Sequence, residues 1–260
     1  MTGKRLCAES LTGENMSIQD VLFIIVVVLA GSCVQGALGF GATMVTMGFL
    51  PLVMDYSKAM GLSLLLMAFC TFSIAFRYRD SIRWGVMLPL LIPTLIICGT
   101  VNVLAAKVSS SIMYLLLGMM FVAVSVFFFV FSNRIHIRPT VASGTALGIV
   151  CGICYGLFAS GGPTAALYLL PSINDKKEYL ATMQAFLFLN NIMIVTISFV
   201  LGRLNVNDLP VVGAGLIGLT AGTLLGLAIH RRIPVNLFGK VIYAFVGIGG
   251  IWIIITHLFV

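Results

Sequence analysis

The chain has 260 residues, of which 60% are hydrophobic and only 9% are charged. A soluble domain carries about 25% charged residues, so this chain has too few charges to cover a surface that faces water. The net charge of +7 comes from basic residues in short gaps between apolar runs, a pattern typical of membrane orientation and not of nucleic-acid binding. We therefore expect a membrane protein that is surrounded by lipid and has no nucleic-acid partner.

The apolar runs predict an all-α integral membrane protein, because backbone that faces lipid must satisfy its hydrogen bonds within helices. The polar residues 1–20 are expected to form an N-terminal extension outside the membrane. Ten helices are then predicted in chain order, at 21–35, 42–54, 58–76, 85–106, 112–131, 140–156, 163–172, 179–201, 209–229 and 236–258. Six are long enough to cross about 30 Å of hydrocarbon. The other four form two short pairs, the first and second helices and the sixth and seventh, and each pair is interrupted by glycine.

The two halves of the chain match each other. At a spacing of 120 residues, two glycines, a proline and an aspartate recur: Gly36, Gly41, Pro51 and Asp55, then Gly156, Gly161, Pro171 and Asp175. A short pair returns the chain to the side of the membrane from which it entered. The three full spans that follow then place the start of the second half on the opposite side, so its topology is inverted. We therefore expect two inverted-topology repeats, residues 21–138 and 139–260, each with a glycine-broken helix pair followed by three transmembrane helices.

The distribution of basic residues predicts the orientation. If the loop with Arg77, Arg79 and Arg83 is cytoplasmic, ten basic residues lie on that side and five lie on the other. Cytoplasmic loops carry the excess of Lys and Arg. We therefore expect a multi-pass protein of the bacterial plasma membrane (the cell inner membrane) with both termini outside.

The glycine-rich breaks at 35–42 and 155–163 are where a binding site is expected. An interrupted helix leaves N–H and C=O groups that cost several kcal/mol each in lipid unless something pairs with them. A new helix begins after each break, and its free N–H groups and partial positive charge favour an anion. The alternative is glycine used for close helix packing, which is the interpretation we give to Gly218, Gly222 and Gly226.

Polar side chains beside the breaks complete the candidate site. Thr43, Ser160 and Thr164 offer hydroxyl donors, and Asn190 and Asn191 lie in the middle of a predicted helix. The asparagines and Gln35 fit either substrate contact or hydrogen bonds between helices. No carboxylate lies at mid-membrane, which argues against a carrier of cations. The predicted substrate-binding residues are Gln35, Gly36, Gly39, Phe40, Gly41, Ala42, Thr43, Gly156, Ser160, Gly161, Gly162, Pro163, Thr164, Asn190 and Asn191.

The cysteines support a hypothesis of a different class. Cys151 and Cys154 form a C-x-x-C pair, and Cys33 lies close to the repeat equivalent of Cys154. A transmembrane thiol–disulfide conductor would need such thiols, but small residues in packed helices are the favoured explanation. No nucleophile stands with a base and an orienting partner, so we expect no enzyme activity, no cofactor and no metal site.

The glycine-rich breaks, each leading to a proline, resemble the paired signature of the sulfite exporter TauE/SafE family. The similarity extends from about residue 21 to the end and rests on these positions: 35–41 with Pro51, and Gly152, Gly156 and 161–163 with Pro171. The chain departs from the family pattern at Phe40 and at 159–160, where relatives have further glycines. The resemblance implies transport of small anions such as sulfite, an organosulfonate or a related sulfur oxyanion.

We therefore predict a secondary transporter, and specifically an exporter, of a small sulfur oxyanion. One half would rock against the other, so that an anion held between two half-helix N-termini near the membrane midplane is exposed to each side in turn. An anion channel, with flux that does not saturate, is the alternative within the same class. The expected partners are the anion, membrane lipid and a coupling proton or sodium ion, and a homodimer is left open.

Overall fold

The computed structural model describes residues 18–105, 107–131, 140–204 and 209–232, and a few residues between 247 and 255. All regular structure in these residues is helical, and six of the helices are long and apolar enough to span a membrane. The predicted all-α membrane class is therefore confirmed. Almost all of the predicted extension at 1–20 lies outside the described residues. Most of the last predicted helix, at 236–258, also lies outside them.

The described helices follow the predicted order closely. They are α1 (Ile18–Leu38), α2 (Ala42–Phe49), the short 3-10 helix η1 (Leu50–Leu52), α3 (Tyr56–Arg77), the 3-10 helix η2 (Arg79–Ser81), α4 (Trp84–Ala105), α5 (Ser110–Phe131), α6 (Val141–Phe158), α7 (Gly162–Ser172), α8 (Lys176–Val200) and α9 (Leu209–Arg232). Several ends differ by a few residues, and two of these differences concern the breaks, because α1 and α6 continue beyond residues 35 and 156. Both helices therefore pass through a glycine that the sequence had assigned to a break.

Close packing explains why Gly36 and Gly156 remain helical. A Cβ at Gly36 would lie 2.9 Å from the carbonyl oxygen of Thr223 on α9, and a Cβ at Gly156 would lie 2.8 Å from that of Cys98 on α4. Small residues let helices approach until backbone meets backbone. These two glycines therefore serve helix contact, and the backbone leaves the helix only one turn later.

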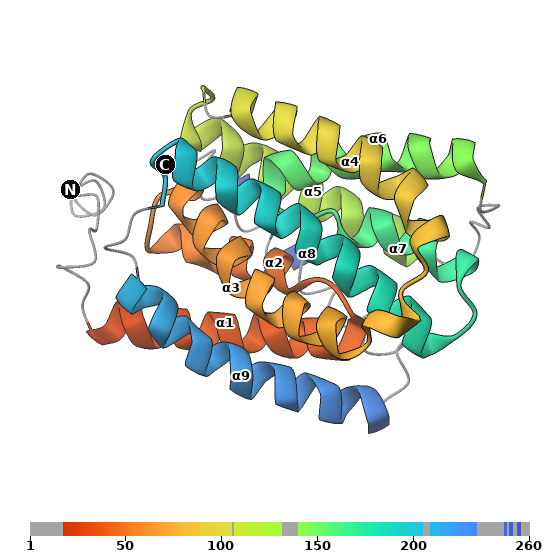
Figure 1. The fold of residues 1–260 in the computed structure, drawn as a ribbon. Helices are drawn as coiled ribbons and strands as arrows, with labels where there is room; N and C mark the ends of the chain where they lie inside the picture. The colour runs from red at the N-terminus through yellow and green to blue at the C-terminus, as the bar shows by residue number, and fades with distance from the viewer. Residues whose placement is uncertain are drawn as a thin grey trace.

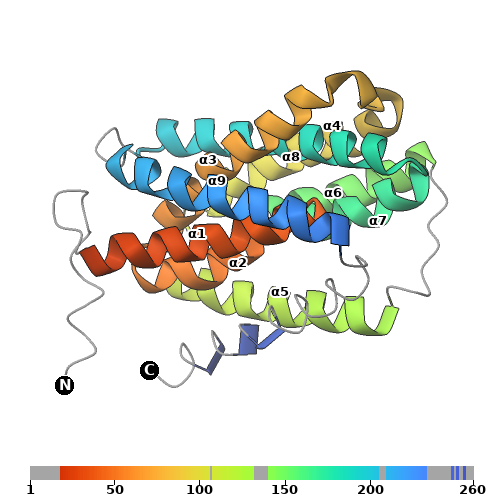
Figure 2. The same cartoon turned by 90° about the horizontal axis from the view of Figure 1, so that it is seen from below.

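Three pairs of long helices form the body of the molecule. In Figure 1, α1 packs on α9 at the bottom, α3 packs on α8 in the middle, and α4 packs on α6 at the top. The short helices contact the long ones on either side of them in the chain, α2 with α1 and α3, and α7 with α6 and α8. Figure 2 shows α5 on one flank. Each long pair joins a helix of the first half to a helix of the second.

Glycine brings α1 and α9 into backbone contact over two full turns. A Cβ on the α9 glycines would lie 2.4, 2.2 and 2.2 Å from α1 carbonyl oxygens in the pairs Gly218 with Ile25, Gly222 with Leu29, and Gly226 with Cys33. Because both numbers rise together, the two helices run parallel. The predicted packing role of this glycine stripe is confirmed.

A second glycine ladder joins α6 to α4. A Cβ on the α6 glycines would lie 2.7, 2.9 and 2.8 Å from α4 carbonyl oxygens in the pairs Gly148 with Leu90, Gly152 with Thr94, and Gly156 with Cys98. These helices are also parallel to each other, and Figure 1 shows that they run opposite to α1 and α9. Two inverted halves would give this arrangement. The repeat and its boundaries at 21–138 and 139–260 stay predictions.

Candidate functional site

Both short helix pairs are interrupted. Between α1 and α2, Gly39 and Gly41 have φ values of 84° and 100°, which glycine adopts without the steric cost that other residues meet. Between α6 and α7, Ala159 takes the left-handed conformation with φ 57°. The chain thus reverses at Gly39–Gly41 and at Ala159–Gly161, within the two predicted breaks.

The helices that begin at these breaks have no side-chain cap. Gly41 precedes α2 and Gly161 precedes α7, and neither offers a side chain to the first-turn amides. By contrast, Asp55, Thr140 and Asp175 each accept a hydrogen bond from the first turn of the helix that they precede, α3, α6 and α8. The N–H groups at the start of α2 and α7 thus remain without an acceptor from their cap residue, which is the arrangement that binds an anion.

The carbonyl groups at the first break are already bonded. Gly39 donates its backbone N–H to the carbonyl oxygen of Gln35 at 2.7 Å. Gln184 on α8 donates its amide to the carbonyl oxygen of Gly39 at 2.9 Å, and accepts from Gln35 Nε2 at 3.3 Å. Gln184 is not among the site residues predicted from the sequence. Its side chain satisfies both the Gly39 carbonyl oxygen and the amide of Gln35.

Donors from the first half satisfy the carbonyls at the end of α6. Asn102 Nδ2 on α4 donates to the carbonyl oxygen of Gly156 at 3.0 Å. Tyr56 Oη on α3 donates to that of Leu157 at 2.7 Å. Hydrogen bonds thus satisfy carbonyl groups at the ends of both α1 and α6. The positive ends of α2 and α7 are the ones left for a ligand.

A pocket lies where the two breaks meet. It is small and partly open, with room for about one water molecule. It is lined by Gln35, Gly41, Thr43, Met67, Tyr155, Ser160, Gly162, Pro163, Leu187 and Asn191. Seven of these were predicted from the sequence: Gln35, Gly41, Thr43, Ser160, Gly162, Pro163 and Asn191. Residues from both halves thus line one pocket.

The other predicted residues lie beside the pocket without lining it. Beyond Gly36 and Gly156, they are Gly39, Phe40, Ala42, Gly161, Thr164 and Asn190. The buried Phe40 side chain packs where Gly162 would carry a Cβ, with its own Cβ 2.8 Å and its ring 3.2 Å from that position. Asn190 donates its amide to the carbonyl oxygen of Phe186, within its own helix, at 2.8 Å. Of the two adjacent asparagines, therefore, only Asn191 lines the pocket.

Ser160 lines the pocket and has a side-chain oxygen without a hydrogen-bond partner among the described residues. The residue is only 3% exposed. A buried hydroxyl without a partner costs free energy. A ligand that accepted a hydrogen bond from this hydroxyl would remove that cost.

Tyr155 orients Asn191 and was not predicted as a site residue. The Tyr155 hydroxyl donates to Asn191 Oδ1 and lies 3.4 Å from the carbonyl oxygen of Leu187. With its oxygen engaged, the Asn191 side chain has its NH₂ group left as a donor. Tyr155 stands one turn before the second break on α6, and only the tertiary fold shows that α6 and α8 meet here.

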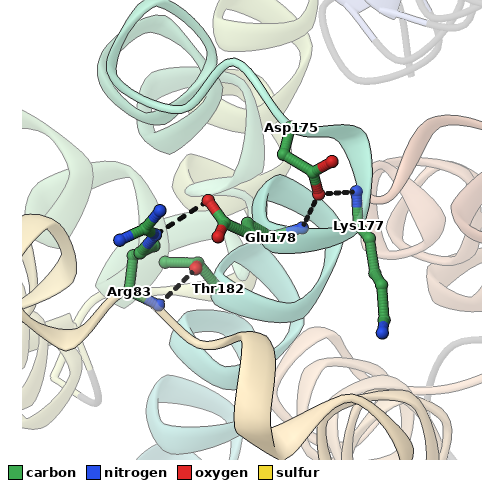
Figure 3. Close-up of polar contacts among 5 residues, drawn as sticks. All are labelled: Arg83, Asp175, Lys177, Glu178 and Thr182. Carbon is green, nitrogen blue, oxygen red and sulfur yellow. Dashed lines mark hydrogen bonds and ion pairs between the residues drawn. The ribbon is translucent and has the colours of Figure 1, made fainter.

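A charged cluster joins the two halves at one end of the bundle (Figure 3). Arg83 Nε and Glu178 Oε2 are 2.7 Å apart, and the backbone N–H of Arg83 donates to Thr182 Oγ1 at 2.9 Å. Asp175 accepts from the backbone N–H groups of Lys177 and Glu178, each at 2.9 Å. The hydrogen bond with Glu178 and its charge raise the pKa of Arg83. This cluster ties the start of α4 to the start of α8.

Arg203 makes a comparable link at the other end of the same two helices. It donates from Nη1 to Asn102 Oδ1 at 3.1 Å and from Nη2 to the carbonyl oxygen of Asn102 at 3.2 Å. Burial lowers the pKa of Arg203, and the charge of Asp55 opposes that change. Arg83 and Arg203 are 120 residues apart in the sequence, and the same spacing separates Asp55 from Asp175. Polar links thus hold α4 and α8 together at both ends.

The described cysteines do not form one thiol path. Cys33, Cys151 and Cys154 are free thiols. Cys33 lies on α1 in the bottom layer of Figure 1, whereas the other two lie on α6 in the top layer. Cys151 donates to the carbonyl oxygen of Gly161 at 3.2 Å, so it supports the second break. The described residues also contain no group of three or more His, Cys, Asp or Glu that could hold a metal ion.

These features define a multi-pass membrane protein with a polar pocket between two interrupted helices. The family model described as "Sulfite exporter TauE/SafE" matches residues 23–253, so the chain belongs to the TauE/SafE family of sulfite exporters. This confirms the resemblance and places the chain in a family of transporters. No curated protein and no solved structure matches it.

Proposed function

We propose that the chain is a secondary transporter that exports a small sulfur oxyanion, such as sulfite or an organosulfonate. One observation carries the proposal: the uncapped N-termini of α2 and α7 meet at a single pocket, although other helices of the bundle are capped by side chains. Helix N-termini stabilise negative charge. Family membership supports the same class of substrate.

The pocket offers donors to a compact oxyanion. Thr43 and Ser160 contribute hydroxyl groups, and Asn191 contributes its NH₂ group because Tyr155 engages its oxygen. The lining residues include no carboxylate that would repel a negative solute. Oxyanion oxygens accept several hydrogen bonds at once, and bonds to charged acceptors are the strong ones. The donors surround a group of sulfonate or sulfite type from more than one helix.

We assign the conformational change of transport to a relative movement of two helix layers. The glycine ladders lock α1 to α9 and α6 to α4, so each ladder crosses between the two halves of the sequence. A rocking of one half against the other would separate both ladders. Relative movement of the α1–α9 layer and the α4–α6 layer keeps the ladders intact and opens the breaks to one side at a time.

The proposal predicts saturable flux that depends on the pocket. Purified protein in proteoliposomes should move radiolabelled sulfite, and imposed proton and sodium gradients would identify the coupling ion. Thr43→Val removes a lining hydroxyl and keeps the side-chain shape. Thr46→Val is the matched control, since Thr46 is buried on the same helix and does not line the pocket. Loss of flux in the first variant alone supports the site, and equal flux in both would refute it.

A channel predicts a different result in the same vesicles. Sulfite flux through a channel would rise in proportion to concentration and would not be driven uphill by an ion gradient. A transporter shows a plateau and accumulates the anion against its own gradient.

A further inference from the structure

We infer that the pocket selects anions with a single negative charge, so that sulfite is carried as hydrogen sulfite and the doubly charged form is rejected. The inference rests on the proposed function and specifies the charge state of its substrate. It follows from the positive charge that the pocket can provide and from an acceptor that the pocket contains.

The positive charge at the pocket comes from helix ends alone. Each helix N-terminus is equivalent to about half an elementary charge, so α2 and α7 together provide about one. None of the described residues that line the pocket is Lys, Arg or His. Arg83 and Arg203 bond to Glu178 and Asn102 at the ends of α4 and α8. One negative charge is therefore balanced and a second is not.

The groups that face the pocket from each element are neutral near neutral pH. They are Gln35 from α1, Thr43 from α2, Met67 from α3, Tyr155 from α6, and Leu187 and Asn191 from α8, with Ser160 between α6 and α7. Behind them, the Cys151 thiol bonds to Gly161, and the Tyr179 ring lies 4.0 Å from a Cβ built at Gly39. Phenols and thiols are protonated near neutral pH. The described residues around the pocket therefore supply no titrating cation that would balance a second charge.

Gln35 provides a place for the proton of hydrogen sulfite. Its Nε2 donates one of its two N–H groups to Gln184 Oε1 at 3.3 Å, and its Oε1 is an acceptor of this pocket-lining side chain. An amide oxygen only accepts hydrogen bonds. It can therefore accept a hydrogen bond from the hydroxyl group of hydrogen sulfite. An unbalanced charge in a site with little water is strongly unfavourable.

Three anions separate the charge states in wild-type proteoliposomes. Sulfite gains a proton near neutral pH, methanesulfonate carries one charge at every pH tested, and sulfate carries two. Initial rates of each would be measured from about pH 6 to about pH 9, with the same pH on both sides of the membrane. Methanesulfonate reports any pH dependence of the protein itself, because its own charge does not change.

We expect methanesulfonate transport at every pH and negligible sulfate transport. Sulfite transport, divided by the methanesulfonate rate, should fall with rising pH and approach a tenfold loss for each pH unit above the pKa of hydrogen sulfite. A sulfite ratio that stays level or rises, or sulfate rates equal to those of sulfite, would overturn the inference and leave the proposed function standing. Failure of all three anions to move would overturn the proposed function itself.

Discussion

Removal of the Ser160 hydroxyl separates the binding role of the pocket from its structural role. Ser160 and Ser63 are both buried, at 3% and 0% exposure, and their Oγ atoms have no hydrogen-bond partner in the part of the chain that the structure describes. Only Ser160 lines the pocket. Ser63→Ala is therefore a matched control for Ser160→Ala in size, chemistry and burial.

The two substitutions should have the same effect on stability and different effects on transport. Replacing an unpaired buried hydroxyl by hydrogen removes its desolvation cost, so each variant should unfold at the wild-type temperature or at most about 4 °C above it, from about 1 kcal/mol. A hydrogen bond to a charged group contributes about 1.5–3 kcal/mol. Ser160→Ala should therefore weaken anion binding by between about tenfold and about 150-fold.

Thermal unfolding in detergent and sulfite flux in proteoliposomes measure the two effects. Addition of sulfite should raise the unfolding temperature of wild type and Ser63→Ala, because a ligand that binds only the folded state stabilises it. Ser160→Ala should require a correspondingly higher sulfite concentration for the same increase. If Ser160→Ala binds and transports sulfite like wild type, the hydroxyl of Ser160 is not part of the site. The same conclusion follows if Ser63→Ala weakens sulfite binding as much as Ser160→Ala does.

Three further predictions concern the structure around the site. Gln184→Leu leaves the Gly39 carbonyl oxygen and the Gln35 amide without their partners, which should cost about 1–3 kcal/mol for each group and lower the unfolding temperature. Gly226→Ala places a Cβ 2.2 Å from the Cys33 carbonyl oxygen and should destabilise the α1–α9 contact by about 1–3 kcal/mol. Gly213→Ala on the same helix is the control, because a Cβ there would have no atom within 4 Å, and it should leave stability unchanged or raise it slightly. Glu178→Gln should lower the unfolding temperature slightly at low salt and leave it unchanged at about 1 M salt, where charges are screened within about 3 Å. A decrease in unfolding temperature that persists in high salt would contradict a role for the exposed ion pair between Arg83 and Glu178.

The sequence predicted the class of the fold and the place of the site because lipid imposes strict limits on the backbone. Runs of apolar residues must be helices there, and a glycine-rich gap between two short runs must be protected inside the protein. This reasoning located Thr43 and Ser160, which both line the pocket. It depended on spacing along the chain and required no knowledge of which helices meet.

The sequence could not separate the two uses of glycine. Gly36 and Gly39 stand three residues apart in the same motif, yet Gly36 packs in a helix and Gly39 has a positive φ. In the second break a positive φ is adopted by Ala159, where the residue type gives no indication of it. Both differences arise from helix contacts across the molecule, which also explain why Tyr155, Met67 and Leu187 were missed.

The ladder between α1 and α9 also has a consequence for biosynthesis. The first helix leaves the ribosome long before its partner, since residues 39–208 must be made in between. At 5–20 residues per second, that interval is about 10–30 s. During this time the face of α1 at Ile25, Leu29 and Cys33 is not yet packed against the glycines of α9. The newly inserted chain must therefore tolerate a long exposure of this face to lipid or to the insertion machinery before the native pairing is available.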